Sequence, residues 1–253
     1  MKVHQFPLGF CLVLTIGSTC QAFAPIHLQR QCSFGGSTSC VESAGTRLSM
    51  TNTNIDQADF EFQELQANLN AMKEAQVNSR NLKPEKRAEL ENYVRTILQK
   101  RESPLTVEDL KRDLPGTQWR LALSNDAAYM GDLPREASVF LEFLTESKLN
   151  YVLKFDERLV IGLKKLTAQS SYEFPEEYPS ALKFTYDEIV TDMFGWKGLE
   201  VPFMGAMKGR DNYLQTAYFD GRTWIDRGYT PNGNEYFNVY TLEEADEVDE
   251  WNL

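Results

Sequence analysis

The chain has 253 residues, of which 42% are hydrophobic, and its 26 basic and 37 acidic residues give it a net charge of −11. The first 50 residues hold three basic residues and one acidic residue, so the remainder carries 23 basic against 36 acidic residues, a net charge of −13. An acidic surface disfavours nucleic acid, and we expect no nucleic-acid partner. No stretch after residue 50 reaches membrane-spanning length, so any membrane contact is expected to be peripheral.

The N-terminal segment has the pattern of two consecutive targeting signals. Residues 1–22 fit a secretory signal peptide, because Lys2 precedes the short apolar run Phe10–Gly17 and small residues follow. Residues 23–50 fit a plastid transit peptide, since they are rich in Ser, Thr and Gly and contain one acid. The junction Ala22–Pro25 resembles the "AFAP" boundary of algae with secondary, red-derived plastids. We predict a plastid protein, stromal or thylakoid-associated; a secreted protein with a flexible linker is the alternative.

Every cysteine and histidine of the chain lies within those first 50 residues. The remainder therefore excludes disulfide scaffolds, cysteine-based zinc sites and catalysis by Ser-His or Cys-His pairs. Carboxylate, lysine, tyrosine and serine chemistry stays open. Because the sequence also lacks a Gly-rich phosphate loop, a serine elbow and a metal-ligand cluster, we predict that the protein is not an enzyme and has no catalytic residues, metal or cofactor.

Residues 51–114 are expected to form a helical arm. Two helices are predicted over Asp56–Ser79 and Glu85–Arg101, and a short third helix follows Thr106, whose hydroxyl can cap it with Asp109 three residues on. Apolar residues at spacings of three and four give each long helix one apolar stripe. The stripes are Phe62, Leu65, Leu69 and Met72 in the first helix, and Leu90, Val94, Ile97 and Leu98 in the second.

Residues 115–242 are expected to form a mainly β domain, and residues 243–253 an acidic tail. Asp220-Gly221 and Asn232-Gly233 supply the positive φ angles that tight hairpin turns need. A meander of about eight or nine antiparallel strands removes its edges best by closing into a barrel. The predicted strands are Trp119–Ser124, Ala137–Thr145, Leu149–Phe155, Arg158–Thr167, Ala181–Ile189, Tyr213–Phe219, Arg222–Gly228 and Glu235–Thr241.

The β domain opens with Gly116-Thr-Gln-Trp119, directly after a short helix. A Gly-x-Trp in this place resembles the opening of lipocalin-type barrels. The resemblance implies that Trp119 plugs the closed end and that an arginine of a late strand, Arg227, covers it by cation–π contact. Trp119 as plain core is the alternative. The expected fold is an antiparallel, lipocalin-like β-barrel of about eight or nine strands behind an arm of two to three helices.

A late segment resembles the C-terminal signature of the plastid lipid-associated proteins, the plant fibrillin family. That signature is Tyr-Leu-Asp, four variable residues, Ile, one residue and Arg-Gly. The matching residues are Tyr218, Asp220, Ile225, Arg227 and Gly228. Trp224 stands where the family tends to have arginine, and Tyr229–Asn234 lengthen the last hairpin. Over about residues 104–242, the resemblance implies a protein that holds or shields a carotenoid, quinone or acyl lipid at or near thylakoid membranes or plastoglobules.

The segment from Asp192 to Arg210 has four glycines, one proline and many apolar residues, among them Phe194, Trp196, Phe203 and Met204. Loops normally run over the surface and are polar, so these side chains must be buried somewhere. A loop that plugs the barrel end is one interpretation. A lid over an apolar cavity, or a patch that contacts lipid, is the other.

Aromatic residues on the strands are further candidates for binding an apolar small molecule or lipid, in particular Tyr151, Phe184 and Tyr218. At β spacing such residues also build ordinary core. The alternative function is that of an assembly or structural partner of a photosynthetic membrane complex, docking through residues 56–101. Exposure of the first helical stripe discriminates the two. An enzyme acting on a lipid is a third hypothesis, which an acid facing the barrel interior would favour.

Overall fold

The structure is a computed structural model that describes residues 52–126, 137–155, 162–200, 208–229 and 233–243, without the side chains of residues 52–56. The predicted signal peptide, transit peptide and acidic tail lie outside these residues, as do Phe203 and Met204. The described elements are α1 (Asn52–Glu74), η1 (Ser79–Asn81), α2 (Pro84–Lys100), α3 (Val107–Asp113), β1 (Gln118–Ser124), β2 (Ser138–Phe143), β3 (Lys148–Lys154), β4 (Leu163–Glu173), β5 (Ala181–Met193), β6 (Trp196–Glu200), β7 (Asp211–Phe219), β8 (Thr223–Tyr229) and β9 (Glu235–Glu243).

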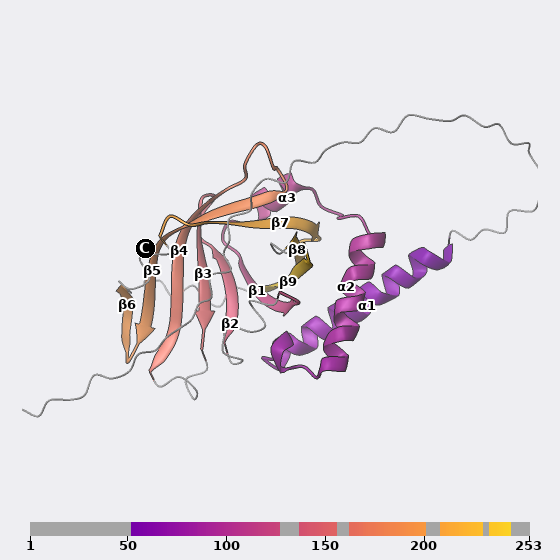
Figure 1. The fold of residues 1–253 in the computed structure, drawn as a ribbon, viewed down its shortest axis with the longest axis horizontal. Coiled ribbons are helices and arrows are strands. Elements are labelled where there is room, and N and C mark those ends of the chain that lie inside the picture. Colours follow the sequence, from indigo (N-terminus) through magenta and orange to yellow (C-terminus); the bar gives the residue numbers. More distant parts are fainter. Residues whose placement is uncertain (1–51, 127–136, 156–161, 201–207, 230–232, 244–253) are drawn as a thin grey trace, which may run out of the picture.

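The nine described strands form one antiparallel sheet in the order β4-β3-β2-β1-β9-β8-β7-β5-β6 (Figure 1). A further pairing of β4 with β5, from Leu163 opposite Met193 to Glu173 opposite Lys183, closes eight strands into a ring. The short strand β6 stays outside the ring and pairs only with the far half of β5. The prediction of a mainly β, antiparallel fold behind helices is confirmed, and closure leaves the sheet few free edges.

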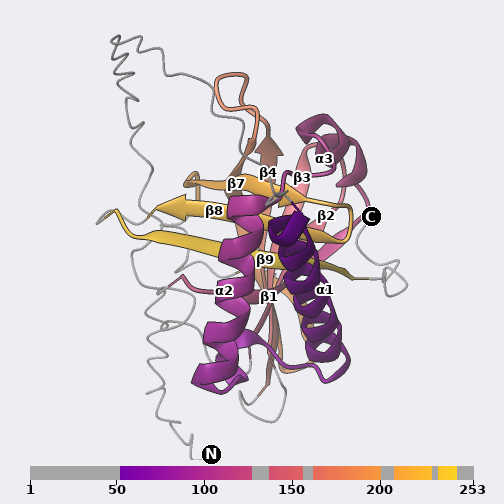
Figure 2. The same ribbon diagram turned by 90° about the vertical axis from the view of Figure 1, so that its right-hand side faces the viewer.

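The helices α1 and α2 pack on the outer face of the ring, across β1, β8 and β9 (Figure 2). Their stripes meet outward side chains of the sheet, and Phe62 contacts the Tyr218 ring edge-on at 5.6 Å. The buried stripe residues are Phe62, Leu65, Leu69, Met72, Leu90, Val94 and Ile97, each at most 8% exposed. The arm therefore belongs to the fold, and the stripe that docking required is covered by the sheet. None of the described helices is long and apolar enough to span a bilayer.

One end of the ring is sealed by α3 and by large aromatic side chains. Leu110 and Leu114 of this segment are fully buried in the inner cluster. Beneath them, Trp119 meets Trp224 edge-on at 5.9 Å and Phe219 at 5.7 Å. The expected cap on α3 is present, because Thr106 and Asp109 each accept a hydrogen bond from the other's backbone N–H. Among the described residues, aromatic rings therefore occupy the centre of this end.

The prediction that Arg227 covers Trp119 is wrong. Successive side chains of a strand point to opposite faces, so Trp224 points inward and Arg227 points outward. The Arg227 side chain is 43% exposed, and its Nε lies 3.5 Å from Glu235. Trp224, which stands where the fibrillin pattern tends to have arginine, covers Trp119 in its place.

Candidate functional site

The segment from Asp192 to Arg210, expected to be a loop, begins instead with a β-hairpin. Met193 of β5 pairs with Trp196 of β6, and only Phe194 and Gly195 connect them. Their φ angles are 53° and 84°. A tight hairpin turn of type I′ needs positive φ at both central residues, which Asn-Gly adopts easily and a phenylalanine adopts at a cost. The hairpin lies on the side of the molecule away from α1 and α2 (Figure 1).

Phe194 is held in this conformation by the start of β4. Its N–H donates a hydrogen bond of 2.7 Å to the carbonyl oxygen of Gly162. Its ring lies so close to Gly162 that a Cβ atom there would overlap it, and the φ of Gly162 is 82°. Only glycine satisfies both conditions at that position. An aromatic residue held in a strained conformation while its side chain remains 65% exposed is a candidate functional feature.

A bulge in β6 places its two apolar side chains on the same face. Thr191 pairs with Leu199 and Met193 with Trp196, so β6 has one extra residue between the pairs, next to Gly198 with a φ of 65°. Cross-strand partners share a face. Trp196 and Leu199 therefore lie on the inner face with Met193. We call Met193, Phe194, Trp196 and Leu199 the apolar ledge.

The apolar ledge joins the interior of the ring to solvent. Its inner member Met193 packs on the inner cluster beside Leu163 and Ile189, which are both 8% exposed. Its outer members remain open, with Trp196 69% and Leu199 38% exposed. The interpretation of this segment as a plug fails for Phe194 and Trp196, because neither side chain is buried. A lid or a lipid-contacting patch remains.

The other predicted binding residues are placed on two different faces. Phe184 is buried inside the ring, in edge-on contact with Tyr186 at 5.6 Å, and Tyr151 packs partly buried against the same inner cluster. Tyr218 lies on the outer face under α1, so it does not line the interior. The structure thus places Phe184 and Tyr151 inside the ring, with Phe184 opposite Tyr172 and far along β5 from the apolar ledge, and separates Tyr218 from them.

The remaining residues of the fibrillin-like motif and of the Gly-x-Trp motif have structural roles. The Asp220 carboxylate accepts backbone N–H groups of the β7–β8 turn, at 2.9 and 2.6 Å. Ile225 is fully buried under the helices. Gly228 lies under the Tyr236 ring, where a Cβ atom would overlap it. Gly116, with a φ of 79°, donates its N–H to Phe143 at 2.8 Å.

A polar row crosses the inner face of four strands, and the sequence interpretation missed it. Register places Thr216 opposite Asp226, Asp226 opposite Asn238, and Asn238 opposite Ser124. Burial raises the pKa of Asp226 to about 8, a rise that the Asn238 hydrogen bond partly offsets and the nearby Asp126 carboxylate increases. Asp226 is therefore protonated at neutral pH. The signal was present in the sequence, because Asp226 occupies the inward phase of its strand with Trp224 and Gly228.

The inward acid meets one condition of the enzyme hypothesis. Within the part of the chain that the structure describes, however, the only side chain hydrogen-bonded to Asp226 is the amide of Asn238. The described residues also contain no cluster of acidic or other ligating side chains that could hold a metal ion. A scan of the chain against protein-family models gave no match, and searches of curated proteins and of solved structures found no significant match.

Proposed function

We propose that this protein holds or shields an apolar molecule, a carotenoid, quinone or acyl lipid, at or near the thylakoid membranes of a plastid. On this proposal it is a lipocalin-like relative of the plastid lipid-associated proteins. The observation that supports it is the apolar ledge, which leads from solvent onto the inner wall of the closed sheet. The targeting pattern and the match at Tyr218–Gly228 support it independently.

Burial of the ledge on a ligand supplies the driving force. Removing apolar surface from water is worth about 25 cal/mol per Å² before ordering costs. Phe194 and Trp196 are the two most exposed large apolar side chains among the described residues. Phe194 lies in the two-residue turn and Trp196 directly follows that turn, so one flat apolar molecule can cover both. Their rigid rings lose little conformational entropy when they do.

The experiment is a titration of the delipidated protein with an isoprenoid quinone, followed by tryptophan fluorescence. We expect saturable binding that Trp196→Ser with Leu199→Ser weakens at least tenfold. Phe60→Ser is the matched control, because Phe60 is 59% exposed on α1, away from the hairpin. That control should leave the affinity unchanged. The proposal fails if the unaltered protein shows no saturable binding to quinone, carotenoid or acyl lipid.

The alternative, docking of the helical arm on a photosynthetic complex, required an exposed stripe on α1. That stripe is covered by the sheet, with Leu65 fully buried and Leu69 2% exposed. No other described feature of residues 56–101 favours docking, and Phe60 is a single exposed ring of a kind that is common on protein surfaces. Ligand binding through the ledge is therefore the function that the geometry supports best.

A further inference from the structure

The apolar ledge lies far along the strands from the sealed end of the ring. The pairing of β4 with β5 starts beside the seal, where Tyr172 contacts Phe143 edge-on at 5.2 Å. The pairing ends where Leu163 lies opposite Met193, the first residue of the ledge. At about 3.3 Å per residue, the β5–β6 hairpin is about 30 Å along β5 from the seal. The ledge and the sealed end therefore belong to different parts of the surface.

The ledge is a projection whose aromatic rings are held in place by the backbone. Phe194 lies in the two-residue turn and Trp196 directly follows it, and their exposed fractions are 65% and 69%. The Phe194 N–H donates to the Gly162 carbonyl oxygen at 2.7 Å, which ties the turn to the start of β4. Rings that project in a fixed position can enter an apolar medium with little further loss of conformational entropy.

The tip of the hairpin carries little charge, although the chain is strongly acidic. From Met193 to Leu199, the only charged residue is Lys197. Asp192, which precedes the tip, accepts a hydrogen bond from the Gly198 N–H at 2.8 Å. A lysine keeps its ammonium group in water while its stem lies along apolar surface. Entry of the tip into an apolar medium therefore desolvates no carboxylate, which would be the most unfavourable step.

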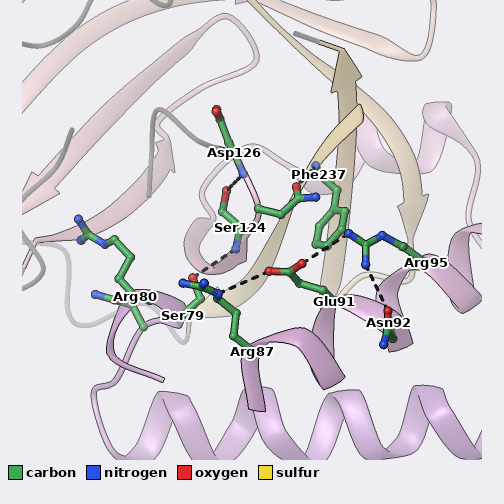
Figure 3. A network of polar contacts seen from close by, with 11 residues as sticks. Ser79, Arg80, Arg87, Glu91, Asn92, Arg95, Ser124, Asp126 and Phe237 are labelled. Atoms are coloured by element: carbon green, nitrogen blue, oxygen red, sulfur yellow. Dashed lines mark hydrogen bonds and ion pairs between the residues drawn. The ribbon is translucent and has the colours of Figure 1, made fainter. Parts of the chain in front are cut away.

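The side of the molecule that carries α2 has the opposite character. The Glu91 carboxylate pairs with Arg87 at 3.6 Å and with Arg95 at 3.5 Å, and Arg95 also donates to Asn92 at 3.2 Å (Figure 3). Contact with an apolar medium would remove water from these charged groups at a high free-energy cost. The charge distribution thus favours the hairpin over α2 as the part of the molecule that meets lipid.

We propose that the β5–β6 hairpin inserts into a lipid surface without net charge, with Phe194 and Trp196 below the headgroups and Lys197 at the water boundary. Tryptophan favours this boundary because its ring is apolar and its N–H is polar. The net charge of −13 after residue 50 is repelled by anionic headgroups. This rests on the proposed function and names the partner of the ledge. An apolar ligand dissolved in that lipid reaches the ledge without crossing water.

The test uses the full chain and phosphatidylcholine vesicles whose acyl chains carry bromine, which quenches tryptophan fluorescence only at short range. Trp119 and Trp224 are 1% and 0% exposed, so bromine in the lipid cannot reach them. The other tryptophans are Trp196 and Trp251, and Trp251 lies outside the described residues. We expect saturable quenching that persists in Trp251→Phe and is lost in Trp196→Phe.

Two comparisons test the contributions of apolar area and charge. Phe194→Ser combined with Leu199→Ser should weaken the quenching titration about tenfold, because less apolar surface is buried in the lipid. The control Phe60→Ser, on α1, should leave it unchanged. Replacing half of the phosphatidylcholine by phosphatidylglycerol should weaken binding at low salt, and added salt should restore it.

Three results would overturn the proposal. Sedimentation with the vesicles without quenching of Trp196 would assign the contact to another part of the chain, such as the apolar run Phe10–Gly17. Quenching that Trp251→Phe abolishes and Trp196→Phe retains would assign it to the C-terminal tail. Tighter binding to the anionic vesicles would contradict a lipid surface without net charge. All three leave the proposed function standing, because the quinone titration contains no lipid surface and is decided separately.

Discussion

Asp226 is a carboxyl group in a place where ionisation is unfavourable. Its pKa rises to about 8 mainly because the group is removed from water, and the Asp126 carboxylate adds to the rise. The unfolded chain ionises this group near the ordinary value of 3.8, so the folded state binds the extra proton over the whole interval between the two values. Proton binding by the folded state alone means that stability depends on pH in that interval.

The sign of that dependence is a testable prediction. The contribution of Asp226 to stability should be complete below pH 4, decline as the pH rises toward 8, and then level off. Asp226→Asn should remove this decline, so that the variant is more stable than the unaltered protein at pH 8. Urea unfolding at several pH values measures it. A stability difference between the two proteins that stays constant from pH 4 to pH 8 would contradict the buried, protonated acid.

Phe194 is expected to lower the stability of the folded protein while it strengthens binding of an apolar ligand. Its φ of 53° suits asparagine better, and Asn-Gly is the preferred pair for this type of turn. Phe194→Asn should therefore raise the free energy of unfolding by about 1 kcal/mol and weaken binding of an apolar ligand. Urea unfolding and the quinone titration measure the two effects. A variant that is destabilised and binds normally would show that Phe194 serves the fold alone.

The helical arm and the β5–β6 hairpin differ in how well the sequence predicts them. Two amphipathic stripes and a capping box predicted α1, α2 and α3, because those signals are local. The predicted end of α1 at Ser79 lies five residues too far along, since the chain turns at Gln76, with a φ of 54°, into η1. The strand β6 was not predicted, because a bulge and the closely spaced positive-φ residues Phe194, Gly195 and Gly198 interrupt the alternation of apolar and polar side chains.

Removal of a buried stripe residue tests whether the arm is part of the fold. Leu65 on α1 is fully buried against the sheet, so Leu65→Ala should lower the free energy of unfolding by about 2–5 kcal/mol. Phe60→Ser, on the exposed side of the same helix, should change it by less than about 0.5 kcal/mol. Urea denaturation followed by circular dichroism compares them. If both substitutions change the free energy of unfolding equally little, the stripe is not needed for stability and a docking surface becomes the better interpretation of it.

Hairpin turn signals and the alternation of apolar and polar residues predict the closed sheet. They do not predict the features that matter for ligand binding. Sequence patterns predicted most strands within a few residues, together with antiparallel order. They did not show which aromatic residues face inward, since a bulge between Thr216 and Tyr218 turns Tyr218 to the outer face. They also did not show that the apolar segment after Asp192 stays exposed, because exposure depends on where the hairpin lies relative to the ring.

Taken as one molecule, the protein is sealed at one end by α3 and aromatic rings, and carries an exposed apolar ledge beside an interior that holds one protonated acid. A net charge of −13 after residue 50 favours uptake of a neutral apolar ligand over an anionic one. Fatty acids should therefore bind more weakly than their methyl esters at pH 8, and added salt should narrow the difference. Competition against a fluorescent acyl probe measures the difference, and tighter binding of the acid would contradict this electrostatic argument.

The most direct test is native mass spectrometry of the delipidated protein after incubation with an equimolar mixture of a carotenoid, an isoprenoid quinone and an acyl lipid. The ledge account predicts one bound apolar molecule per chain, retained in Phe60→Ser and lost when Trp196→Ser and Leu199→Ser are combined. Protein that remains free of adducts, or adducts that the combined ledge variant retains in full, would contradict it.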